Sequence, residues 1–169
     1  YSYVADPWEL AYKMVNAANN FIYYVDKLSE NLFGENRKTE MLAEAKFARA
    51  FGHAFLLRRY GYFWDINSPL GPIIRLEPSS ISNNSMGRSS VKESYEKIFE
   101  DLDYAIQYGP RFYSKYRSCA TTAKAFKADI LMNRGEEGDY AEAIRLANEV
   151  IASDEFGLED LSLIHISEP

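Results

Sequence analysis

A short aromatic tract followed directly by polar side chains is the part of this sequence best suited to chemistry. The tract contains Tyr62, Phe63 and Trp64, and Asp65 and Asn67 come just after it. Flat rings can stack on the apolar C–H faces of a sugar, while carboxylate and amide groups hydrogen-bond to its hydroxyls. The composition predicts a carbohydrate-binding platform at these residues, except Phe63, which we expect to pack inward. The alternative that Trp64 also packs against the preceding helix stays open.

A second group of rings lies further along the chain, in the irregular segment RFYSKYRS at 111–118. It contains Tyr113 and Tyr116, whose rings carry polar tips suited to binding sites and rims. By the same reasoning, Tyr113 is a candidate ligand-binding residue.

Catalytic motifs are absent from the sequence. It has no Gly-x-Ser-x-Gly elbow, no glycine-rich phosphate loop and no His-x-x-x-His zinc pair. Asp65 and Glu77 are the loop carboxylates that a glycosidase would need, but nothing in the sequence brings them together. We therefore expect no catalytic residue, no cofactor and no enzyme activity.

The histidine and cysteine content argues against a metal site. Cys119 is the single cysteine, which excludes an intrachain disulfide and a cysteine zinc site. His53 shares a predicted helix face with Lys46 and Arg49, where no Cys, Asp or Glu lies at ligand spacing. We interpret His53 as packed or hydrogen-bonded. Because Glu44 and Arg49 are five residues apart, we expect each to pair with a neighbouring helix.

Length and charge limit the other possibilities. The 169 residues, 47% of them hydrophobic, are enough for one domain with a sizeable core. The net charge of -6 comes without a basic block, so we expect no nucleic acid partner. No run of about 18 apolar residues occurs, so nothing in the sequence predicts a membrane-spanning helix.

A helix expected at about 36–60 ends directly before the aromatic tract and must position it. Two apolar stripes run along it at spacings of three and four. One is built mostly from small residues, which allow another backbone to come close, and the other from bulky residues that fill a core. The first stripe is Ala45, Ala48, Gly52 and Phe55, and the second is Phe47, Phe51, Ala54 and Leu57.

Four further helices are predicted from capping signals and apolar spacing. The first should take Asp6 as its N-cap and end near Leu28, and the others are expected at 91–108, 122–133 and 139–153. The last of these carries Tyr140, Ile144, Ala147 and Ile151 at helical spacing. A long loop separates the second and third helices at 61–88. No stretch alternates as a strand, so we predict an all-α fold, an irregular tetratricopeptide-like helical repeat scaffold with long decorated loops.

Five stretches, in the right order, resemble the SusD/RagB family of nutrient-binding outer-membrane lipoproteins. The family pattern EA-x-F-L-R-A-F is kept from Glu44 to Phe51, except that Ala48 replaces Leu. On the basis of this resemblance, we assign residues 1–158 to a partial SusD-like helical region and residues 159–169 to a tail of doubtful origin. The stretches are WELAYKMVNAANNFI (8–22), MLAEAKFARAFGHAFLLRRYG (41–61), RSSVKESYEKIFEDLDYAI (88–106), TTAKAFKADILMNRG (121–135) and GDYAEAIRLANEVIAS (138–153).

This resemblance implies that the protein binds glycans or other nutrients at the outer membrane and delivers them to a TonB-dependent transporter of the SusC type. It also implies a lipid anchor that is not in this chain. The alternative is a helical-repeat module that binds a protein partner and no sugar. The two hypotheses differ in where a ligand would bind, on the aromatic loops or on the groove face of the helices.

Overall fold

The computed structural model describes residues 2–157, with side chains from Pro7 onward. This part of the chain contains five α-helices and no strand, which confirms the all-α prediction. The tail predicted at 159–169 lies outside the described residues. The helices are α1 (Ser2–Asp26), α2 (Arg37–Tyr60), α3 (Val91–Tyr108), α4 (Ala120–Arg134) and α5 (Asp139–Ala152), with short 3-10 turns at Glu30–Leu32 and Ile81–Asn83.

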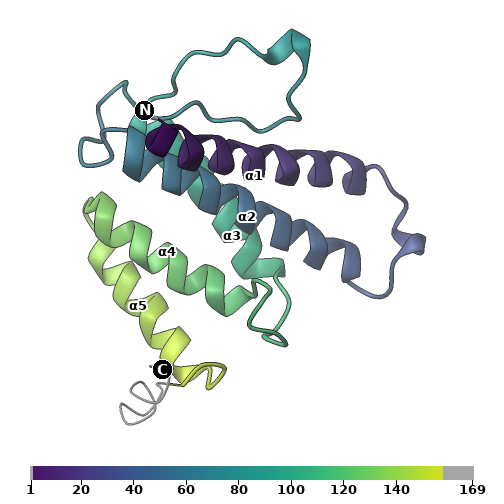
Figure 1. Ribbon diagram of the computed structural model, residues 1–169. Coiled ribbons are helices and arrows are strands. Elements are labelled where there is room, and N and C mark those ends of the chain that lie inside the picture. The colour runs from purple at the N-terminus through teal and green to yellow at the C-terminus, as the bar shows by residue number, and fades with distance from the viewer. Residues whose placement is uncertain (1, 158–169) are drawn as a thin grey trace, which may run out of the picture.

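Each helix packs against the one that follows it in the chain (Figure 1). The central helix α2 contacts α1 on one side and α3 on the other, and α4 and α5 extend the array from α3. Between α2 and α3 a long loop runs along the outer side of α1, to which it is hydrogen-bonded. The order of neighbours is that of the predicted tetratricopeptide-like scaffold, with one large insertion.

The small-residue stripe of α2 faces α1, and the predicted close approach of another backbone is found at Gly52. A Cβ atom added at Gly52 would lie 2.7 Å from Cγ2 of Val15 and 3.4 Å from the carbonyl oxygen of Ala11. Real Cβ atoms are not found that close to another heavy atom, so only glycine fits here. The two backbones therefore approach more closely at this position than a side chain would allow.

The bulky stripe of α2 is only partly buried. Ala54 and Leu57 lie in the main core cluster with the apolar residues of α3, and Phe47 packs at its edge. Phe51 is 43% exposed, which corrects the prediction that it fills the core. Its ring instead lies beside that of Phe126 from α4, with centroids 5.1 Å apart.

Two helix starts differ from the predicted ones. The first helix begins at Ser2, so Asp6 is not its N-cap, and Pro7 lies inside the helix. The fixed φ of proline is compatible with a helix, and its missing N–H removes one backbone hydrogen bond of α1. The fourth helix begins at Ala120, two residues before the predicted start, because Sγ of Cys119 caps it by accepting the Thr122 N–H at 3.4 Å.

The fifth helix has the predicted position, but its apolar series faces outward. Tyr140, Ile144 and Ile151 are 59%, 63% and 74% exposed. Ala143 and Leu146 are the buried residues that pack on α4. Because α5 carries two apolar stripes and packs chiefly on α4, one of the stripes is left exposed in the described part of the chain.

Candidate functional site

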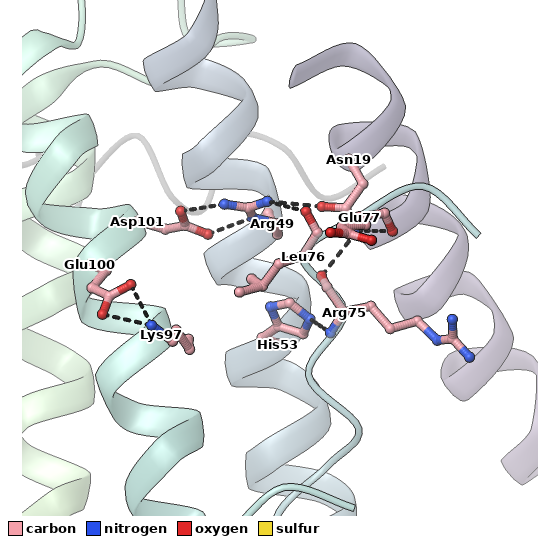
Figure 2. Close-up of polar contacts among 9 residues, drawn as sticks. All are labelled: Asn19, Arg49, His53, Arg75, Leu76, Glu77, Lys97, Glu100 and Asp101. Atoms are coloured by element: carbon pink, nitrogen blue, oxygen red, sulfur yellow. Dashed lines mark hydrogen bonds and ion pairs between the residues drawn. The ribbon is translucent and has the colours of Figure 1, made fainter. Parts of the chain in front are cut away.

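A buried polar cluster joins α1, α2 and α3 beneath the long loop (Figure 2). Nε and Nη2 of Arg49 donate to the two carboxylate oxygens of Asp101 at 2.7 and 2.8 Å. Nη1 donates to Oδ1 of Asn19 at 2.9 Å and to the carbonyl of Leu76 at 3.1 Å. The buried guanidinium is thus paired with a carboxylate, and each of its three nitrogens donates at least one hydrogen bond. The prediction that Arg49 pairs with a neighbouring helix is confirmed.

The same cluster holds the middle of the long loop in place. Nδ2 of Asn19 donates to the carbonyl oxygens of Arg75 and Glu77, both at 3.0 Å. The backbone N–H of Arg75 donates to Nε2 of His53 at 3.2 Å. Because these contacts satisfy buried backbone groups, residues 75–77 are fixed against the helices.

His53 is a structural residue of this cluster, as predicted. It is fully buried, and burial followed by the charge of Arg49 lowers its pKa to about 3. Since Nε2 accepts a hydrogen bond from Arg75, the proton of the neutral ring lies on Nδ1, which has no partner among the described residues. The described residues also hold no group of three or more His, Cys, Asp or Glu placed to bind a metal ion.

The aromatic tract forms an exposed pair of rings beyond the end of α2. Tyr62 and Trp64 stack with centroids 5.1 Å apart and planes 19° apart, and they are 48% and 64% exposed. Phe63 packs on the core cluster, its ring lies edge-on to that of Trp64 with centroids 5.2 Å apart, and its carbonyl oxygen accepts a hydrogen bond from Tyr95 (3.0 Å). Phe63 therefore anchors the tract, and the other two rings face solvent.

Asp65 and Asn67 shape the turn that carries these rings. Oδ1 of Asp65 accepts the backbone N–H of Asn67 at 3.1 Å, and the backbone N–H of Asp65 donates to the carbonyl of Tyr62 at 2.9 Å. Both polar side chains are exposed. The structure thus brings four of the five predicted site residues together in one turn.

The fifth predicted residue, Tyr113, lies elsewhere. Its hydroxyl donates to Oε1 of Glu44 at 3.3 Å, near the N-terminal end of α2. Glu44 and Tyr60 are sixteen residues apart on this helix, which corresponds to about 24 Å. Glu44 also forms an ion pair with Arg117. Both of these residues that contact Glu44 lie in a loop and not, as expected, on a neighbouring helix. The segment between α3 and α4 passes this end of α2 and supplies both contacts.

The two loop carboxylates weighed for glycosidase chemistry are also separated. The backbone of Glu77 is held by Asn19 at the level of Arg49, whereas Asp65 follows the end of α2. From Arg49 to Tyr60 the helix rises about 16 Å, well beyond the roughly 5 to 9.5 Å between paired glycosidase carboxylates. The structure does not bring these acids together.

Two hollows between α1 and the long loop were missed by the sequence reasoning. They measure about 390 and 420 Å³. A usable signal was present, since Trp8, Tyr12 and Tyr23 share one helical face. Trp8, Tyr12, Asn16, Ile73, Arg75 and Ser79 border the first hollow, and Tyr23, Tyr24, Glu77, Ser79, Ser80 and Ser82 the second.

Residues 2–131 match the sequence profile of a family described as SusD-like, starch-binding associating with outer membrane. The chain is 30% identical over 137 residues to SusD-like protein P2 of Formosa agariphila, which covers 80% of this chain and 25% of that protein. It is 26% identical over 153 residues to a SusD-like protein of Bacteroides ovatus, covering 85% of this chain and 26% of the relative. The chain therefore spans about a quarter of the length of these relatives.

Solved structures share the fold. A SusD superfamily protein from Bacteroides thetaiotaomicron has a TM-score of 0.77 at 25% identity, over 92% of this chain and 33% of its own. A SusD-like protein from Bacteroides fragilis has a TM-score of 0.73 at 27% identity, over 92% and 28%. A structure with a xylogluco-oligosaccharide has a TM-score of 0.77 at 24% identity, over 94% and 31%, a likeness that concerns the fold alone.

Proposed function

This chain belongs to the SusD-like family, and we propose on that basis that it binds glycans or other nutrients at the outer membrane. The family description, starch-binding and associating with outer membrane, supports the ligand class and the location. The chain spans about a quarter of the length of its relatives, so other parts of a longer protein would contribute to the complete activity.

The single observation that carries sugar binding within this chain is the exposed stack of Tyr62 on Trp64. A stacked pair presents a flat apolar face of the kind that suits a pyranose ring. Asp65 and Asn67 add exposed hydrogen-bonding groups in the same turn. Because Phe63 anchors this turn in the core, the rings need little ordering when a sugar binds.

Tyr113 remains a candidate ligand-binding residue at a separate position. It is 55% exposed and lies beside Glu44, near the opposite end of α2 from the Tyr62–Trp64 pair. A ligand at Tyr113 would therefore occupy a site of its own.

We further propose that the protein hands its ligand to a TonB-dependent transporter of the SusC type and is held at the membrane by a lipid anchor outside this chain. The resemblance to the SusD/RagB family supports both points. No helix in the described part of the chain is both long and apolar enough to cross a bilayer. In this proposal the protein binds and does not catalyse, and its partners include no nucleic acid.

A second candidate function, a module that binds another polypeptide and no sugar, is favoured by one observation. The outward face of α5 carries Tyr140, Ile144 and Ile151, all more than half exposed. An uncovered apolar stripe on a helix is a usual site for packing against another chain. This candidate places the binding surface on α5 and not on the aromatic turn.

Calorimetric titration of the Trp64→Ala variant with maltoheptaose and with a xylogluco-oligosaccharide tests the main proposal. We expect affinity to fall by about 1 to 3 kcal/mol, the value of one large apolar contact, while the melting temperature stays unchanged. Tyr140→Ala is a matched control, because this tyrosine is similarly exposed on α5. Equal affinities for wild type and Trp64→Ala would contradict the platform.

A further inference from the structure

A row of aromatic and amide side chains runs along the face of α1 that the long loop covers. The spacings of four, four, three and four place its members on one side of the helix. Asn19 is buried beneath the loop, and the other members border the two hollows between helix and loop. The row consists of Trp8, Tyr12, Asn16, Asn19 and Tyr23.

The two hollows follow one another along α1, and together they are named the crevice. Both are bordered by Ser79, whose backbone N–H donates to Oδ1 of Asn16 at 2.8 Å and so links the loop to the helix where the hollows meet. Trp8 stands at one end of the crevice and Tyr24 at the other, sixteen residues apart on α1, which corresponds to about 24 Å. The crevice thus has rings at its ends and amide and hydroxyl groups in between.

We propose that this crevice is a second, extended carbohydrate site that takes a neutral oligosaccharide chain. The inference rests on the proposed function and adds a position separate from the Tyr62–Trp64 pair. Rings at both ends suit the apolar faces of successive sugars, and polar groups between them suit the hydroxyls.

The charges around the crevice favour a neutral ligand over an anionic one. Lys13 is paired with Glu9 at 2.7 Å, and the guanidinium of Arg75 donates to the backbone carbonyls of Asn83 and Asn84. The carboxylate of Glu77, which borders the second hollow, has no hydrogen-bond or ion-pair partner among the described residues. A phosphate would meet this carboxylate, whereas a sugar hydroxyl could donate to it.

Both walls of the crevice are fixed before a ligand arrives. The hydroxyl of Tyr12 donates to the carbonyl of Ile73 and accepts its N–H, both at 3.1 Å. Further along, Asn19 holds the carbonyls of Arg75 and Glu77. A preformed site lowers the ordering cost of binding, which is an advantage for a flexible ligand such as an oligosaccharide.

The two tryptophans of the chain allow the crevice and the platform to be tested separately, because Trp8 lies in one and Trp64 in the other. In a Trp64→Phe variant the tryptophan fluorescence reports on the crevice, and in a Trp8→Phe variant it reports on the platform. Each variant is titrated with maltose, maltoheptaose and a xylogluco-oligosaccharide after its thermal melt shows that it is folded.

We expect the fluorescence of Trp8 to change on addition of a longer oligosaccharide. Tyr24→Ala, placed in the Trp64→Phe background, should weaken that response roughly tenfold, since Tyr24 is 63% exposed at the far end of the crevice. It should leave any response to maltose unchanged, because a disaccharide cannot reach from Trp8 to Tyr24. Tyr140→Ala, similarly exposed on α5, serves as the control and should change neither response.

The possible failures are distinguishable. A response of Trp64 without one of Trp8 would overturn the crevice and leave the proposed function standing. A Trp8 response to the longer sugars that is insensitive to Tyr24→Ala would overturn the extended site. A change in Trp8 fluorescence without one in Trp64 fluorescence would support the crevice and contradict the platform. If neither tryptophan changed its fluorescence on addition of sugar, both proposals would be contradicted.

Discussion

Arg49 and Asp101 form a bidentate ion pair across the interface of α2 and α3, with hydrogen bonds of 2.7 and 2.8 Å. The remaining amino group of Arg49 reaches the other way, to Asn19 on α1 and to the carbonyl of Leu76 in the long loop. One buried side chain therefore links three helices to the loop (Figure 2). Because the loop forms one wall of the proposed crevice, this pair couples core stability to the shape of the ligand-binding surface.

Replacing Arg49 by methionine should strongly destabilise the protein. The change leaves Asp101 buried without its partner, and loss of one member of a buried pair costs about 3 to 5 kcal/mol. Urea unfolding measures this loss. Arg58→Met is a matched control, because its pair with Asp129 is partly exposed and should be worth about 0 to 1 kcal/mol. Equal losses in the two variants would show that burial of the Arg49 pair has no special effect.

The elements of this fold were largely predictable, because their signals are local. Asn36 and Gly61 border α2, Ser90 caps α3 by accepting the N–H of Glu93, and Gly135 ends α4 with a positive φ of 66°. Each of these features is encoded within a few residues of the helix end. Local signals were therefore enough to place four of the five helices within two residues of their ends.

The arrangement of the site was less predictable, because it depends on contacts between distant residues. Asn19, Arg49 and His53 set the path of the long loop by hydrogen-bonding to its backbone. Because the backbone is the same at every residue, the loop sequence does not indicate where these contacts form. The position of Tyr113 depends in the same way on Glu44, 69 residues earlier. The four residues of the aromatic turn were grouped correctly because they are neighbours in sequence.

Gly52→Leu should destabilise the contact between α1 and α2. Even a Cβ atom at this position would lie 2.7 Å from Cγ2 of Val15, so a larger side chain must push the helices apart. Overpacking of this kind costs roughly 1 to 3 kcal/mol or more, measured as a shift of the denaturant midpoint. Gly87→Leu is the matched control, since a Cβ there has no neighbour within 4 Å. A midpoint for Gly52→Leu equal to that of the control would contradict the close approach of the two helices.

The two apolar stripes of α5 should respond differently to truncation. Leu146 is buried against α4, so Leu146→Ala should cost about 2 to 5 kcal/mol of unfolding free energy. Ile144 is 63% exposed, and Ile144→Ala should change stability by no more than about 0.5 kcal/mol. Urea melts of the two variants measure both values. A large loss for Ile144→Ala would mean that this stripe is covered in solution.

The stability of the protein should fall as the pH is lowered from 8 to 5, because of His53. Burial lowers the pKa of this histidine to about 3 in the folded protein, against roughly 6.5 in the unfolded chain. Above pH 6.5 the ring is neutral in both states and has no effect on stability. Below that pH the unfolded chain binds a proton that the folded protein excludes, so stability decreases until the pH approaches the folded pKa.

Between pH 8 and pH 5 this linkage amounts to about 2 kcal/mol. Carboxylates with lowered pKa values, such as Asp139, lose their contribution only at lower pH, so the window isolates the histidine. Urea melts at the two pH values measure the loss. His53→Gln can still accept the N–H of Arg75 but cannot titrate, so its stability should be nearly independent of pH in this range. His165→Gln, which changes the other histidine of the chain, should keep the full dependence. A pH dependence that persists in His53→Gln would show that another group is responsible.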